Sequence, residues 1–129
     1  MQGKIVGYVT VGTNDLDRAR KYYNELLAEL GATEVTLSER FCFWNVAGGQ
    51  TVFSVFIPYD EAEATPGNGA MVGFPAADEA QVKRLYEKAL ALGGTDEGAP
   101  GNRMDTFYAA YVRDLDGNKL VFYHTNMQI

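Results

Sequence analysis

The chain carries the same strand–helix unit in each half, and this repeat constrains the fold more than any other feature of the sequence. Residues 4–33 combine an alternating apolar segment, an amphipathic helical pattern and a glycine stop, and residues 70–95 repeat that order. Tyr23 and Tyr86 occupy matching points of the two helical patterns. A spacing that holds across half of a chain indicates a tandem duplication of one supersecondary unit.

Apolar periodicity and turn residues divide each half into five elements in the same order. In the first half we expect, in chain order, a strand over residues 4–11, a helix capped by Asn14 or Asp15 and ending near Leu30, and strands over residues 33–38, 40–46 and 51–57. In the second half we expect a strand over residues 70–76, a helix capped by Asp78 and ending at Gly93, a short strand near Thr95, and strands over residues 107–113 and 119–125.

One helix covers only one face of a sheet, so two such βαβββ modules must combine their remaining faces. The sequence therefore predicts an α+β fold in which tandem βαβββ modules form a curved mixed sheet, a cup, with the helices on the outside. We expect a single domain over residues 1–129, with module 1 at about residues 4–58, an exposed acidic linker at about 59–68 and module 2 at about 69–125. Ligand sites favour concave joints of this kind.

The composition argues against several classes of partner. The formal net charge is -6 at pH 7, whereas nucleic acids and anionic membrane surfaces select clustered lysine and arginine. No apolar run approaches the roughly 20 residues that a membrane helix needs, and the N-terminal sequence does not have the pattern of a signal peptide. Cys42 is the single cysteine, so no internal disulfide can form. These features predict a cytoplasmic protein.

Four sequence motifs are specific when their order and spacing are taken together. They are V-T-x-G-x-x-D-L-x-R-A-x-x-Y-Y over residues 9–23, G-N-G over 67–69, A-P-G-N-R over 99–103 and Y-A-A-Y-V-R-D-x-D-G-N over 108–118. In these motifs the chain resembles, over nearly its whole length, the glyoxalase / bleomycin-resistance / extradiol-dioxygenase superfamily, also called vicinal oxygen chelate proteins. The resemblance implies paired βαβββ modules, a cup, frequent homodimers and often a divalent metal in the cup.

The resemblance also implies four metal-ligand positions, one on the first and one on the last strand of each module. In this chain they carry Tyr8, Phe53, Met71 and Val121, where relatives carry His, Glu or Gln. Phe53 and Val121 offer no donor atom. The thioether of Met71 suits soft metals only, and Tyr8 ligates only as a phenolate. We therefore expect the scaffold of the family without its metal site or any other cofactor.

Two arginines near the second module's last strands are further candidates. Arg103 and Asp105 lie on the loop before residues 107–113. Arg103 suits either a clamp for a substrate carboxylate or, as we prefer, a solvated loop pair with Asp105. Arg113, at a strand end, is expected to brace the neighbouring turn.

The single histidine, His124, is predicted to lie on the face of the last strand that points away from the cup. Strand alternation places Tyr123 on the same face as Val121, and His124 on the opposite, helix-covered face. A structural or surface role is therefore expected for His124, because a one-residue slip that turned it inward would turn Val121 and Tyr123 outward.

Aromatic residues are abundant in the predicted inner strands. They are Phe41, Phe43, Trp44, Tyr108 and Tyr111. They suit either a pocket for a planar ligand or ordinary core packing, and we expect core packing for most of them. Alternation alone does not assign the faces of residues 40–46 and 107–113. Cys42 is interpreted as a buried, unreactive thiol.

Function hypotheses from different classes follow from this sequence. The first is a glyoxalase-like or bleomycin-resistance-like protein that binds a small apolar or aromatic molecule in its cup. The residues expected to line the cup are Tyr8, Phe53, Met71, Val121, Tyr123 and Arg103. The alternative is a divalent-metal-dependent lyase, isomerase or dioxygenase, similar to lactoylglutathione lyase. A third hypothesis is a metal-free enzyme in which Tyr8 is the general acid or base.

Overall fold

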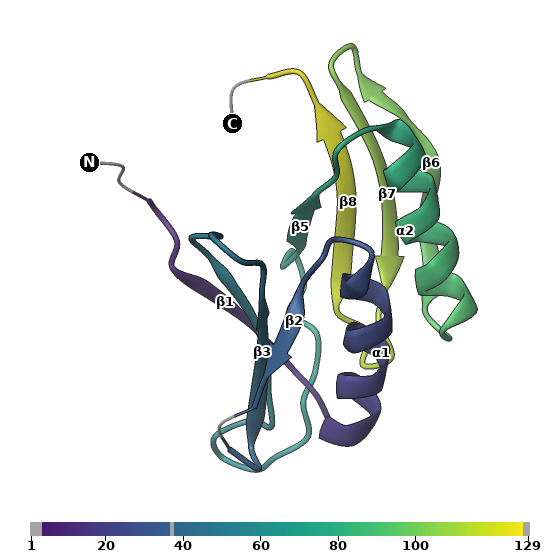
Figure 1. The fold of residues 1–129 in the computed structure, drawn as a ribbon. Helices are drawn as coiled ribbons and strands as arrows, with labels where there is room; N and C mark the ends of the chain where they lie inside the picture. Colours follow the sequence, from purple (N-terminus) through teal and green to yellow (C-terminus); the bar gives the residue numbers. More distant parts are fainter. Residues whose placement is uncertain (1–3, 37, 128–129) are drawn as a thin grey trace. The chain divides into compact units, whose positions relative to one another are not determined.

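The first half of the chain folds as one βαβββ unit in the computed structural model, which describes residues 4–36 and 38–127. Its elements are β1 (Tyr8–Gly12), α1 (Leu16–Ala28), β2 (Thr33–Val35), β3 (Phe41–Asn45) and β4 (Val52–Phe56) (Figure 1). They form a four-stranded sheet of order β1-β4-β3-β2, in which β1 is parallel to β4 and the other pairs are antiparallel. Leu37, which the predicted second strand includes, lies outside the described residues.

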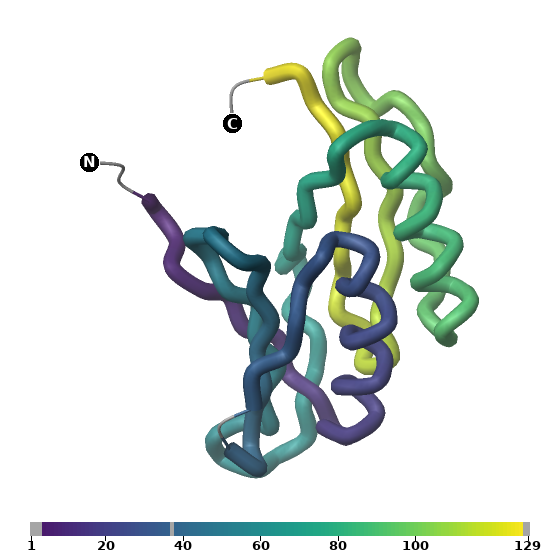
Figure 2. The backbone as a smooth tube through the Cα atoms, in the orientation of Figure 1, coloured from purple at the N-terminus to yellow at the C-terminus, as the bar shows by residue number. Residues whose placement is uncertain are grey.

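The second half repeats this unit. Its elements are β5 (Val72–Pro75), α2 (Glu79–Ala91), β6 (Thr95–Met104), β7 (Phe107–Arg113) and β8 (Lys119–Thr125). The sheet order is β5-β8-β7-β6, with β5 parallel to β8. The chain passes from unit 1 to unit 2 between Thr65 and Pro66, inside the predicted linker. Figure 2 follows the backbone through the two units in sequence colours. The α+β class and the tandem βαβββ modules are thus confirmed, and the organisation as one domain and the joint cup stay predictions.

An aspartate caps the N-terminus of each helix: Asp15, one of the two candidates that the sequence offers, before α1, and the predicted Asp78 before α2. The Asp15 carboxylate accepts a hydrogen bond from the Arg18 amide at 3.0 Å, and Asp78 accepts one from the Gln81 amide at 2.8 Å. The Gln81 side chain accepts in turn from the Ala77 amide at 2.8 Å. Such side chains satisfy amide groups that the first helical turn leaves without partners. Gly31, at φ 77°, follows α1 in the left-handed region that favours glycine.

The core of unit 1 lies between α1 and one face of its sheet. The buried residues of α1 are Ala19, Tyr22, Tyr23, Leu26 and Leu27. The Tyr23 ring lies 4.8 Å from the Phe53 ring and 5.6 Å from the Trp44 ring, measured between centroids. Because successive side chains of a strand point to opposite faces, these contacts place Phe53 on the helix-covered face, together with Trp44 and Cys42.

Unit 2 builds its core in the same way. Val82, Leu85 and Ala89 are the buried residues of α2, and the elements that α2 contacts are β6, β7 and β8. Phe74 and Phe122, on the paired strands β5 and β8, are buried with their ring centroids 6.0 Å apart. Each helix therefore covers one face of its own sheet, as predicted, and within the described residues no helix is long and apolar enough to cross a membrane.

The strand between Thr95 and Met104 differs most from its prediction. The sequence indicates only a short strand near Thr95, whereas β6 extends over ten residues. Its register against β7 shifts three times. Pro100 falls in one of these shifts, between Gly98, which pairs with Tyr111, and Gly101, which pairs with Ala109. Bulges of this kind admit glycine and proline without ending the pairing. At the other end of the chain, β1 begins at Tyr8 and not at residue 4.

The single cysteine is buried in the core of unit 1. Cys42 has no exposed surface, and this burial raises the pKa of its thiol to about 11, with a further contribution from the charge of Glu34. The protonated thiol is therefore the form that the fold favours. An unfolded thiol ionises with a pKa of about 8.5. The protonated Cys42 thiol therefore makes its full contribution to the free energy of unfolding below about pH 8.5, and this contribution is lost as the pH rises towards 11.

We expect the free energy of unfolding of the wild-type protein to fall more steeply between pH 9 and 11 than that of a Cys42→Ala variant. The difference in slope has a ceiling of about 1.4 kcal/mol per pH unit, the value for one proton. Urea denaturation at a series of pH values measures both slopes. Equal slopes in the two proteins would contradict the buried position of this thiol.

Candidate functional site

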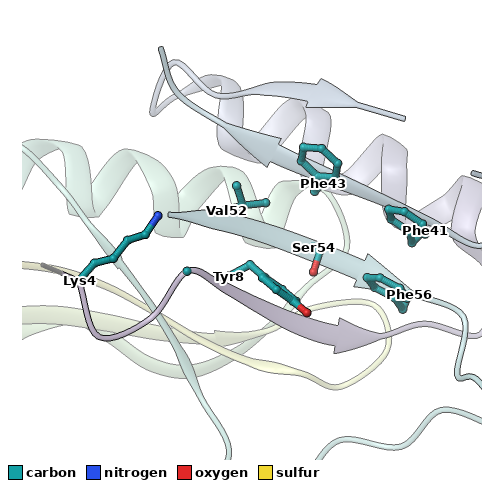
Figure 3. Close-up of a pocket in the computed structure, with 8 residues that line it drawn as sticks. Lys4, Tyr8, Phe41, Phe43, Val52, Ser54 and Phe56 are labelled. Carbon is teal, nitrogen blue, oxygen red and sulfur yellow. The ribbon is translucent and has the colours of Figure 1, made fainter. Parts of the chain in front are cut away.

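A pocket of about 440 Å³ lies on the face of the unit 1 sheet that α1 leaves uncovered (Figure 3). We call it the open-face pocket. Its lining residues are Lys4, Gly7, Tyr8, Phe41, Phe43, Val52, Ser54 and Phe56. The volume is in the range of small-molecule sites, roughly 300–1,000 Å³.

Strand pairing brings these side chains to one face. Tyr8 of β1 pairs with Val52 of β4, and Ser54 of β4 pairs with Phe43 of β3. Phe56 pairs with Phe41 in the same antiparallel ladder. Directly paired residues point to the same side of a sheet. Three strands therefore contribute alternate residues to one surface, whereas the residues between them point towards α1.

Aromatic rings form one end of the pocket. The rings of Phe41 and Phe56 are stacked, with centroids 4.5 Å apart and an angle of 5° between their planes. Figure 3 shows these two rings at one end of the row of lining residues and Lys4 at the other end, with Tyr8 and Ser54 between them. An apolar wall with a few placed polar groups is the usual composition of a small-molecule site.

The polar groups of the pocket differ in what they offer a ligand. The Ser54 hydroxyl donates to the Val9 carbonyl at 2.8 Å, so its 2.7 Å contact with the Thr10 hydroxyl is one in which Ser54 accepts. Because its proton is committed to Val9, Ser54 offers a ligand only an acceptor. Tyr8 is 68% exposed and offers both a donor and an acceptor.

Phe53 is not part of this surface, in contrast to the prediction. It pairs with Val9 and is 7% exposed, with its ring against Tyr23 of α1. The prediction placed Phe53 on the same face as Tyr8, but the register sets Tyr8 opposite Val52. Alternation then assigns Val52 and Ser54 to the open face and Phe53 to the core.

The other predicted lining residues belong to unit 2. Val121 pairs with Gly73 and is 3% exposed, while Met71 precedes β5 and is 49% exposed. Tyr123 is partly buried, and its ring stacks on Phe107 with centroids 5.3 Å apart. Val121 and Tyr123 share a face of β8 by alternation, as predicted. Their role in a joint cup stays a prediction.

Arg103 folds back on its own hairpin. Its guanidinium donates to the Ala99 carbonyl at 2.5 Å and lies 5.4 Å from the centre of the Tyr111 ring. It also lines, with Asp105, a second pocket of about 340 Å³ over residues 102–105. The contact with Ala99 occupies one donor of Arg103, and the role of Arg103 as a carboxylate clamp stays a prediction.

Arg113 and His124 make contacts that agree with the structural roles expected from the sequence. Arg113 donates to the Glu97 carboxylate and to the Gly117 carbonyl, each at 3.0 Å, and so braces the turn between β7 and β8. The Nδ1 atom of His124 lies 3.3 Å from the Ala76 carbonyl oxygen. Both side chains are thus held by their own unit.

The donor atoms of the open-face pocket do not fit the divalent metal that relatives often carry. Its side-chain donors are the hydroxyls of Tyr8 and Ser54 and the cationic amine of Lys4, whereas such metals prefer carboxylate, carbonyl and imidazole ligands. Within residues 4–36 and 38–127, no three His, Cys, Asp or Glu side chains gather in a way that could hold a metal ion.

Sequence reasoning missed five residues of the pocket. They are Lys4, Gly7, Val52, Ser54 and Phe56. Residues 52–57 are apolar on both faces except for Ser54, so alternation alone does not tell which residues face the helix. The signal that finds Val52, Ser54 and Phe56 is the parallel pairing of β4 with β1, which fixes their faces from Tyr8. Lys4 and Gly7 precede β1, so this pairing does not locate them.

Comparisons with known proteins agree with this architecture. Residues 5–122 match the model of the Glyoxalase/Bleomycin resistance protein/Dioxygenase superfamily. A search of curated proteins finds none that matches the chain.

Solved structures share the fold. A glyoxalase/bleomycin resistance protein from Albidiferax ferrireducens T118 is 35% identical, with a TM-score of 0.87 over 94% of this chain and 98% of that one. A glyoxalase/bleomycin resistance protein/dioxygenase family enzyme from Burkholderia phytofirmans PsJN is 19% identical, with a TM-score of 0.75 over 92% and 97% of the two chains. A glyoxalase-related enzyme from Fulvimarina pelagi is 21% identical, with a TM-score of 0.74 over 93% and 87%.

The two βαβββ units, the matched residues and these structures agree with the resemblance seen in the motifs. The chain belongs to the glyoxalase/bleomycin resistance protein/dioxygenase superfamily.

Proposed function

We propose that the protein binds a small, largely apolar or aromatic molecule in the open-face pocket of unit 1. The observation that carries the proposal is a pocket of about 440 Å³ whose walls include the stacked pair Phe41 and Phe56. A planar ligand has aromatic surface to stack against, and such contacts contribute about 0.5–1.5 kcal/mol beyond the burial of area.

Tyr8 is the polar side chain best placed to contact such a ligand. It lies on the edge strand β1, it is exposed, and Figure 3 shows its ring reaching along the pocket towards Ser54 and Phe56. Its hydroxyl can donate to a ligand and accept from it, while Ser54 can only accept. A ligand with a donor group beside its aromatic ring would satisfy both hydroxyls.

Binding of 2-naphthamide, a neutral planar probe, tests the proposal by calorimetric titration. We expect saturable binding to the wild-type protein that weakens about tenfold in a Phe43→Ala variant, the equivalent of about 1.4 kcal/mol. Phe107→Ala is the matched control, because Phe107 is a partly buried ring of unit 2 that does not line the pocket. The absence of binding, or an equal loss of affinity in both variants, would rule out this site.

Two further measurements separate this function from catalysis. About one equivalent of metal per chain, in protein purified without chelators, would favour the metal-dependent lyase, isomerase or dioxygenase. If an activity is found, a Tyr8→Phe variant that keeps it would exclude Tyr8 as the general acid or base. Homodimerisation and a cytoplasmic location remain predictions from the family and the composition.

A further inference from the structure

The open-face pocket carries one charged side chain, and it is a cation. The Lys4 ammonium donates one hydrogen bond, to the Gln50 carbonyl at 2.7 Å, and an ammonium has three donors. Among the described residues no carboxylate is within ion-pair distance of Lys4. Donors therefore remain for a ligand at this end of the pocket.

The rest of the lining carries no negatively charged side chain. The eight lining residues include no aspartate or glutamate, although the whole chain has a net charge of -6. A net negative protein disfavours the non-specific adsorption of anions. Binding of an anion here would therefore depend on the local charge of Lys4.

The positions of the cation and the rings set the shape of the ligand. The stacked rings of Phe41 and Phe56 lie at the end of the pocket away from Lys4 (Figure 3). A molecule that uses both ends needs a flat apolar body and an acidic group at one end of it. Ser54, which can only accept, lies between the two ends.

We propose that the ligand is a planar aromatic anion of the aryl carboxylate class, with its carboxylate on Lys4 and its ring against Phe41 and Phe56. This inference rests on the proposed function and names the ligand class of the same pocket. An exposed lysine–carboxylate pair contributes little, so the preference for the anion is expected to be about fivefold.

The test compares 2-naphthoate with its neutral isostere 2-naphthamide by calorimetric titration at pH 7. We expect the wild-type protein to bind 2-naphthoate about fivefold more tightly, and added salt to reduce this ratio. A Lys4→Met variant loses the preference and still binds 2-naphthamide, and Lys4→Arg keeps it. Lys83→Met, in the exposed part of α2, changes the net charge equally and leaves the ratio unchanged.

The outcomes distinguish the inference from the function beneath it. One outcome is that 2-naphthamide binds the wild-type protein as tightly as 2-naphthoate and that Phe43→Ala lowers the affinity for it. In that case the anion inference fails and the binding function stands. If neither probe binds, both fail. Sedimentation of the same samples tests whether a second copy of the chain occupies this face instead. A wild-type dimer that binds neither probe and that Phe43→Ala dissociates would overturn the proposal.

Discussion

A Trp44→Ala variant is expected to lose about 3–5 kcal/mol of the free energy of unfolding, the usual cost of removing a large aromatic side chain from a core. Trp44 is 2% exposed, packs against Tyr23 and Phe53, and donates from its indole nitrogen to Asn24 at 2.8 Å. The substitution removes these contacts and leaves the Asn24 side-chain oxygen without that donor. Urea denaturation followed by circular dichroism measures the change.

Phe43→Ala is the matched control on the same strand. Phe43 is the neighbour of Trp44, but it lies on the open face and keeps part of its surface in water. We expect its truncation to cost only about 1 kcal/mol, because little apolar area returns to water. Similar losses in the two variants would show that the faces of β3 are not assigned correctly.

An Asp114→Ala variant is expected to lose about 2–4 kcal/mol. Asp114 is 5% exposed, and its carboxylate accepts from the amides of Asp116 and Asn118 at 2.9 Å each and from the Asn118 side chain at 3.0 Å. Alanine leaves these donors without the acceptor, and buried donors without partners are costly. The turn between β7 and β8 should therefore loosen, which denaturation and amide hydrogen exchange of residues 113–119 would detect.

Asp105→Ala removes an exposed aspartate of the same unit and serves as the control. The Asp105 side chain lies on the hairpin between β6 and β7 in contact with water. Substitutions at such surface positions usually change stability by no more than about 0.5 kcal/mol. A loss in Asp105→Ala equal to that in Asp114→Ala would mean that net charge, and not the turn contacts, determines the effect.

The repeat, the caps and the turns could be predicted because local chemistry determines them. Asp15 and Asp78 cap the helices, and Gly117, at φ 87°, occupies the predicted hairpin turn. The extent of β6 could not be predicted. Its glycines and proline are typical of a loop, and only pairing with β7, through repeated bulges, makes the segment a strand.

The predictions about the site depend on strand register, which a single sequence specifies poorly. The family resemblance points to Tyr8, and this residue lines the open-face pocket. Phe53 was assigned to the same face, although a shift of one residue moves a side chain to the other side of a sheet. An apolar strand such as β4 gives no polar marker except Ser54, whose hydroxyl bonds within the sheet at Val9 and Thr10.

We propose that a small aromatic molecule binds to the uncovered face of the unit 1 sheet, and not to its helix-covered face or to the second unit. Two-dimensional amide NMR of the labelled protein, titrated with 2-naphthamide, tests it most directly. We predict saturable shifts centred on the amides of residues 41–43 and 52–56. Shifts confined to residues 102–105, or no saturable shift at all, would contradict the claim.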